Sequence, residues 1–121
     1  MPKVLVLSPS GLVRFRVKKE LKPRGFDVVE GDGADTVANR LVRAERPDVV
    51  LVDASASSSA GERLVRCLKG DPLTASTPVL FFSDDALEAR SAVLDVGADG
   101  VVPRLDDFDG LAETLALHLK R

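Results

Sequence analysis

The sequence predicts a three-layer α/β sandwich, in which helices cover both faces of a five-stranded parallel sheet. Strand and helix patterns alternate along the 121 residues of the chain. Three of the predicted strands are nearly continuous apolar runs, which is typical of parallel strands buried on both faces. Short stretches that contain Gly, Pro or Ser separate the patterns. A length of 121 residues suits one domain, residues 1–121, and is too short for two.

Each predicted strand is a short run rich in Val, Leu or Phe. The predicted strands cover Lys3–Leu7, Phe26–Glu30, Arg46–Asp53, Pro78–Phe82 and Gly100–Val102. The predicted helices cover Leu12–Lys22, Ala34–Glu45, Ala60–Lys69, Ala86–Val96 and Phe108–Lys120. In the first helix, the spacing predicts a core face of Leu12, Phe15, Val17 and Leu21. Because crossovers between parallel strands are right-handed, the helices fall on both faces of the sheet. The alternating pattern therefore predicts an open parallel sheet with helices on both faces.

Composition indicates a globular protein without a strong preference for nucleic acid. The chain is 45% hydrophobic and 30% charged, and its formal net charge is -2. No apolar run approaches the roughly 20 residues that a membrane span requires. The single cysteine, Cys67, excludes an internal disulfide and fits a reducing compartment. We therefore expect a cytoplasmic domain that binds neither nucleic acid nor a membrane.

Polar residues follow several of the predicted strands, at the point where each strand ends. Asp53 ends the apolar run Val49–Val52, and Ser8 follows the first strand. Ser83 and Asp84 follow the fourth strand. In open parallel sheets, functional sites form outside the carboxyl ends of the strands. The candidate site is therefore expected at this edge of the sheet.

Three stretches in order resemble the receiver domain of two-component response regulators, of the chemotaxis-regulator type. They are "PDVVLVD" ending on Asp53, "GDPLTASTPVLFFS" ending on Ser83, and "VGADGVVPR" ending on Arg104. The resemblance covers the whole chain and implies a flavodoxin-like (βα)5 sandwich with strand order 2-1-3-4-5. It implies metal-assisted transfer of a phosphoryl group from a phosphohistidine to an aspartate, a reaction that depends on positioning and cations. By resemblance, Asp53 is the candidate phosphoacceptor, Ser83 contacts a phosphoryl oxygen, and Arg104 stands where the family carries a lysine.

The sequence departs from the family where a magnesium ion would be held. Receiver domains usually end the first strand on two adjacent acids, and Ser8 and Pro9 occupy those places. Magnesium is normally held through carboxylates, so Asp53 and a backbone carbonyl near Ser55 are the obvious ligands left. We therefore expect no cofactor and at most weak binding of magnesium.

Further departures affect switching and access. Val101 occupies the position of an aromatic residue that swings inward on activation in the family. Leu105, rather than proline, follows Arg104, and Ser57 replaces a proline that precedes the retained Gly61. Asp84 stands where the family has a small residue, and its carboxylate would repel an incoming phosphoryl group.

These observations favour a signalling module that acts through protein contacts, with aspartyl phosphorylation weakened or lost. Such a module is not an enzyme, beyond self-phosphotransfer and autodephosphorylation at Asp53. Its expected partners are a histidine kinase, an output domain, or a second copy bound through the fourth helix, fifth strand and fifth helix. The alternative is a conventional receiver that a histidine kinase phosphorylates on Asp53. A nucleotide-binding or flavin-binding enzyme is disfavoured, because "SPSG" lacks the glycine-rich pattern of a phosphate loop.

The remaining features are interpreted structurally. Arg104 is expected to pair with Asp53 or Asp84, because a carboxylate near the sheet edge is costly without a partner. Otherwise Asp53 is an inherited residue that only ends the third strand. Cys67 is expected in or near the core, His118 on an exposed helix surface, Gly31–Gly33 in a turn, and Ser55–Ser59 in a solvated loop. The basic stretch Arg14–Arg24 is expected on the polar face of the first helix, either solvated or as a docking face.

Overall fold

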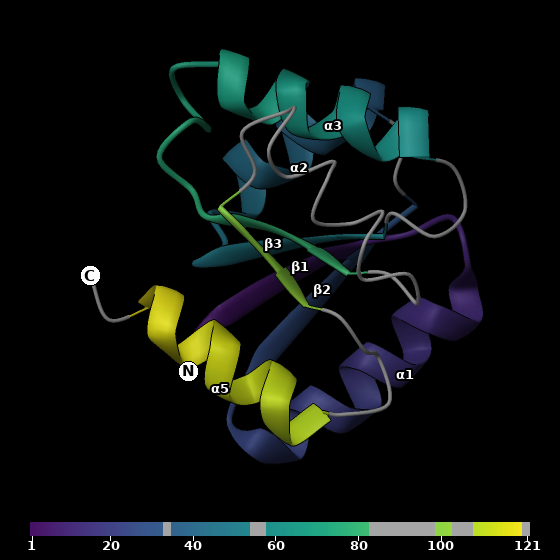
Figure 1. Cartoon of the computed structure of the whole chain (residues 1–121), viewed down its shortest axis with the longest axis vertical. Coiled ribbons are helices and arrows are strands. Elements are labelled where there is room, and N and C mark those ends of the chain that lie inside the picture. The colour runs from purple at the N-terminus through teal and green to yellow at the C-terminus, as the bar shows by residue number, and fades with distance from the viewer. Residues whose placement is uncertain (33–34, 54–57, 83–98, 103–107, 120–121) are drawn as a thin grey trace.

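A computed structural model describes residues 1–32, 35–53, 58–82, 99–102 and 108–119 of the chain (Figure 1). Within these ranges, five parallel strands form one sheet in the order β2-β1-β3-β4-β5, which confirms the predicted topology. The strands are β1 (Lys3–Leu7), β2 (Asp27–Gly31), β3 (Val49–Asp53), β4 (Val79–Phe82) and β5 (Gly100–Val102). Gly31, predicted in a turn, is the last residue of β2 and pairs with Leu7 of β1.

Helices cover both faces of this sheet, as predicted. They are α1 (Gly11–Leu21), the short 3₁₀ helix η1 (Lys22–Arg24), α2 (Asp35–Glu45), α3 (Ser58–Gly70) and α5 (Phe108–Leu119). Figure 1 shows α1 and α5 on one side of the sheet and α2 and α3 on the other. The helix predicted over residues 86–96 lies outside the described ranges. None of the helices described is long and apolar enough to cross a membrane.

The core consists of two apolar layers, one on each face of the sheet. Alternate residues of a strand point to opposite faces, so Val4 and Val6 of β1 pack in one layer and Leu5 and Leu7 in the other. All five residues of β3 are buried. The apolar runs therefore form strands buried on both faces, as the sequence indicated.

Two predicted core positions in α1 are wrong. Leu12 is 71% exposed and Phe15 is 59% exposed, whereas Val17 and Leu21 are fully buried. Val13 also packs against the core. Residues 13, 17 and 21 recur at a spacing of four and share one side of the helix. Leu12 and Phe15 therefore fall on the opposite, outward side.

Two predictions about α3 are also corrected. Cys67 is exposed rather than in or near the core, because the buried stripe consists of Leu64, Val65 and Leu68. The helix begins at Ser58, two residues before the predicted start. Ser58 and Ser59 are therefore helical and do not belong to a solvated loop.

The connection from α3 to β4 is fixed by hydrogen bonds around Lys69. The Lys69 ammonium donates to the carbonyl oxygens of Ala75 and Thr77 at 3.2 and 3.0 Å. It also lies 2.6 Å from Asp99 Oδ2, and this oxygen accepts the backbone N–H of Val79 at 2.8 Å. These contacts fix where β4 begins, and thereby where its carboxyl end meets the sheet edge.

Gly25 provides a test of the turn that joins η1 to β2. Its φ of 93° lies in the left-handed region, where a side chain is strained. We expect Gly25→Ala to destabilise the domain by about 1 kcal/mol in urea unfolding. Gly70→Ala, at the end of α3, is the matched control and should be neutral or stabilising because alanine favours the helix. Equal effects of the two substitutions would contradict this account.

Candidate functional site

Asp53 is the last residue of the central strand and is almost completely enclosed. It pairs in register with Phe82 of β4, and its exposed fraction is 7%. On the other side of β3, Val52 pairs with Leu7, the last residue of β1. The residue that follows β1, Ser8, is thereby brought beside Asp53. The predicted juxtaposition of polar residues at this edge is confirmed for this pair.

A buried hydrogen bond joins Ser8 to Asp53. The Ser8 hydroxyl donates to Asp53 Oδ2 at 2.7 Å, and Ser8 is fully buried. The same hydroxyl oxygen accepts the backbone N–H of Ser10 at 3.1 Å. The Ser8 backbone N–H donates to the Gly31 carbonyl at 3.1 Å. Hydrogen bonds to a carboxylate are stronger than those between neutral groups, so the Ser8 hydroxyl is a strong partner for the Asp53 side chain.

Arg14 holds the backbone of Ser8 from the side of α1. Its Nη1 donates to the Ser8 carbonyl at 2.5 Å, and its Nε lies 3.6 Å from Oε1 of Glu30 on β2. Lys18 lies 3.8 Å from the other Glu30 oxygen. Arg14 was not predicted as part of the site. Its guanidinium contacts a backbone carbonyl, which every residue type carries, so no sequence pattern indicates this contact.

The described residues around Asp53 do not fit a magnesium site. Ser8 supplies a neutral hydroxyl whose proton is directed at the carboxylate, and Pro9 is exposed and has no side-chain oxygen. No group of three or more His, Cys, Asp or Glu residues that could hold a metal occurs in the part of the chain that the structure describes. Magnesium is small, demands octahedral oxygen ligation and is usually bound through carboxylates. The described residues named here supply a single carboxylate, that of Asp53.

Several predicted site residues lie outside the described ranges, namely Ser83, Asp84 and Arg104, with Ser55, Ser57 and Leu105. The pairing of Arg104 with Asp53 or Asp84 therefore stays a prediction. Val101 lies in β5, where its backbone pairs with Phe81 of β4.

His118 is half-buried, so its predicted place on an exposed surface is corrected. A Cβ atom added at Gly100 of β5 would come within 3.3 Å of His118 Nε2. The imidazole therefore packs over the strand where glycine leaves space for it.

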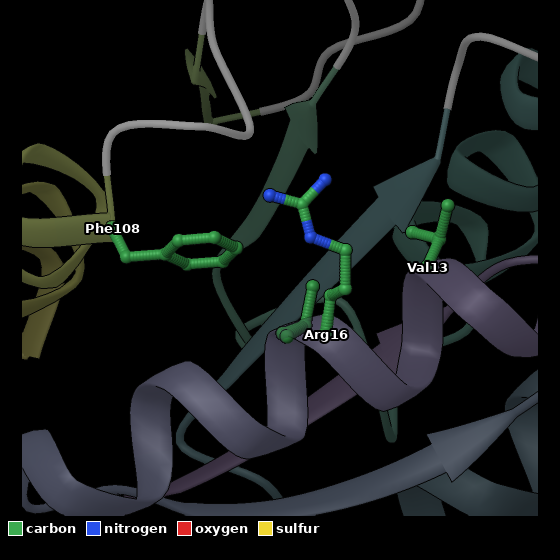
Figure 2. A pocket seen from close by; sticks show the side chains of 4 residues that line it. Val13, Arg16 and Phe108 are labelled. Carbon is green, nitrogen blue, oxygen red and sulfur yellow. The ribbon is translucent and has the colours of Figure 1, made fainter.

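A pocket lies between α1 and α5, and Asp53 is not among the residues that line it. Figure 2 shows Arg16 and Val13 on α1 and Phe108 on α5 around this pocket, and Val17 also lines it. The Arg16 guanidinium carbon lies 5.7 Å from the centre of the Phe108 ring, which is within range of a cation–π contact. The contact links the two helices on this face of the sheet.

Known proteins with similar sequences are bacterial response regulators. No family model matches the chain. The chain is 24% identical over 102 residues to the phosphate regulon transcriptional regulatory protein PhoB of Pseudomonas aeruginosa, a match that covers 84% of the chain and 44% of PhoB. It is 32% identical over 81 residues to protein PilH of the same organism, covering 66% of the chain and 65% of PilH. The matches span less than two thirds of the length of either relative.

Solved structures with the same fold are receiver domains. Chemotaxis protein CheY4 of Vibrio cholerae superposes with a TM-score of 0.81 at 26% identity, covering 98% of this chain and 99% of that one. A response regulator from Thermotoga maritima gives a TM-score of 0.82 at 22% identity, covering 100% and 99%. The chain has the receiver fold of response regulators, as its sequence motifs indicated.

Removal of the Ser8 hydroxyl tests the energetic role of the buried bond. We expect Ser8→Ala to lower the free energy of unfolding by about 1.5–3 kcal/mol at neutral pH, because a buried carboxylate loses a donor. Urea unfolding measures this loss. Ser76→Ala, which removes the hydroxyl of an exposed serine, is the control and should change stability by less than about 0.5 kcal/mol. Equal costs for the two variants would show that the Ser8–Asp53 bond contributes nothing particular.

Proposed function

We propose that this receiver domain acts as a signalling module through protein–protein contacts, and that magnesium-dependent phosphorylation of Asp53 is weakened or lost. The observation that carries the proposal is the buried Ser8–Asp53 hydrogen bond. It stands where receiver domains usually carry an acidic pair. Phosphoryl transfer requires cations that neutralise the transferring group. A neutral hydroxyl cannot recruit one.

The electrostatic consequence of the missing acids is large. At an effective dielectric constant of about 20, a close pair of unit charges interacts by roughly 4 kcal/mol before desolvation is subtracted. A divalent ion beside Asp53 alone lacks the attraction of the two further carboxylates that an acidic pair would supply. Ser8 and Pro9 add no charge to compensate for that loss.

Exposed apolar side chains support a role in protein contacts. Leu12 and Phe15 lie on the outward side of α1, at 71% and 59% exposure, and Arg16 and Lys19 beside them are also exposed. We propose a histidine kinase or an output domain as partner, and a second copy bound through the β5–α5 side as a further option. The module itself is not an enzyme, and we place it in the cytoplasm.

A conventional phospho-accepting receiver is the second candidate. It is favoured by the retention of Asp53 at the end of β3, which is where the receiver class carries its phosphoacceptor. Ser83 and Arg104 also keep a hydroxyl and a cation at the positions that the sequence resemblance assigns to phosphate contact.

Magnesium binding separates the two candidates. We expect calorimetry to show no sub-millimolar affinity of the domain for Mg²⁺, because one carboxylate is a poor magnesium site. The double substitution Ser8→Asp with Pro9→Asp should restore affinity, and magnesium should then raise the melting temperature of that variant. The same variant carrying Asp53→Asn is the control and should bind more weakly. Sub-millimolar binding by the unaltered domain, together with phosphorylation of Asp53 by a small phosphodonor, would establish the second candidate.

The switch position provides an independent test. Val101 stands where an aromatic side chain would move on activation, so little coupling to the last strand and helix is expected. When a phosphoryl mimic is added with Mg²⁺, the amide resonances of residues 101–117 should stay in place. Concerted shifts through this segment would reveal a two-state element and overturn the expectation.

A further inference from the structure

The Ser8 hydroxyl joins two parts of the molecule through a single oxygen atom. It donates its proton to Asp53 Oδ2 at 2.7 Å and accepts the Ser10 backbone N–H at 3.1 Å. A serine hydroxyl has one proton, so this arrangement requires Asp53 Oδ2 to act as the acceptor. Ser8 is fully buried, so water cannot substitute for a lost partner at its surface.

Ser10 continues the connection into α1. It is the N-cap of this helix: its hydroxyl accepts the Val13 N–H at 3.3 Å, and its carbonyl accepts the Arg14 N–H at 3.1 Å. An N-cap fixes where a helix begins by satisfying donors of its first turn. Pro9 separates Ser8 from Ser10, and its ring restricts the backbone between them. Arg14 closes the loop by donating to the Ser8 carbonyl.

The other end of α1 is held by contacts that do not involve Asp53. Arg24 of η1 donates to Asp109 Oδ1 of α5 at 2.9 Å and lies 3.1 Å from Glu20 Oε2. The bonds to Asp109, and then to Glu20, raise the pKa of Arg24 above its usual value. The Phe26 N–H also donates to the Leu21 carbonyl at 3.2 Å. The far end of α1 is therefore anchored independently of the Ser8–Asp53 hydrogen bond.

We infer that Ser8 couples the state of the Asp53 carboxylate to the first turn of α1, and so to the exposed pair Leu12 and Phe15. If Asp53 Oδ2 stops accepting this hydrogen bond, the Ser8 hydroxyl is free to reorient. The backbone N–H of Ser10, the N-cap residue, then loses the fixed acceptor that Ser8 Oγ provides. Leu12 and Phe15 lie within five residues of that cap. The inference rests on the proposed function in that α1 presents the contact surface. It adds that the conformation of this surface depends on the state of the Asp53 carboxylate.

A double-mutant cycle tests the coupling, with the amide resonances of residues 10–16 as the readout and without magnesium or phosphodonor. Asp53→Asn removes the negative charge of the acceptor and replaces one of its oxygens by an NH2 group, so it weakens the hydrogen bond from Ser8 and should shift these resonances. Ser8→Ala should shift the same set. In the Ser8→Ala background, Asp53→Asn should add little, because the connection is already cut. Equal shifts from Asp53→Asn in both backgrounds, or shifts that stay outside residues 10–16, would overturn the inference.

Hydrogen exchange keeps the test decisive if Asp53→Asn fails to fold. Ser8→Ala alone should speed exchange of the Val13 and Arg14 amides by about tenfold, since a hydrogen bond of this class contributes on that scale. Thr74→Val is the matched control, because it removes another fully buried hydroxyl, which donates to the Leu68 carbonyl. It should leave α1 exchange unchanged. Equal acceleration in both variants would show general loosening and refute the coupling.

These outcomes are separable from those of the proposed function. Phosphorylation of Asp53 by a donor with magnesium would refute the loss of phosphotransfer and leave the cycle intact. An additive cycle would refute the coupling and leave the magnesium result intact.

Discussion

The central strand β3 imposes the constraint on which the site depends, because it is buried along its whole length. Valines and a leucine fill both faces between β1 and β4, and Asp53 at its end keeps only 7% of its surface exposed. A carboxylate in that place requires hydrogen-bond donors, or its charge would be very costly. The neighbouring strand end supplies one. Ser8 follows β1 directly, and the parallel register brings its hydroxyl to the carboxylate.

The sheet could be predicted from the sequence because its strands carry an unambiguous pattern. Runs such as Val49–Val52 have no polar face, which restricts them to the interior of a covered parallel sheet. Helix α1 carries a weaker signal. It has apolar side chains at residues 12, 13, 15, 17 and 21, which allow two different stripes on one helix. The packing against β1 and β2 selected the stripe with a spacing of four, and composition alone does not contain that choice.

The candidate site was predicted in outline only. Ser8 and Asp53 could be placed at one edge because each follows or ends a parallel strand, and the family resemblance implied that their strands are neighbours. Their hydrogen bond could not be predicted, because it depends on the rotamers of two short side chains. From the sequence, Arg104 was expected to pair with Asp53 or Asp84. A neutral hydroxyl was not considered as the partner of Asp53, although Ser8 was placed at the same edge of the sheet.

A hydroxyl and a metal ion stabilise a carboxylate in physically different ways. A divalent ion neutralises charge without regard to which carboxylate oxygen it meets, and its occupancy depends on its concentration in solution. The Ser8 hydroxyl is covalently part of the chain, donates one hydrogen bond to one carboxylate oxygen, and accepts a hydrogen bond from the backbone N–H of Ser10. Its contribution is therefore independent of ions but sensitive to what Asp53 Oδ2 can accept. The Ser8 hydroxyl therefore gives this edge of the sheet a directional contact that is connected, through Ser10, to the start of α1.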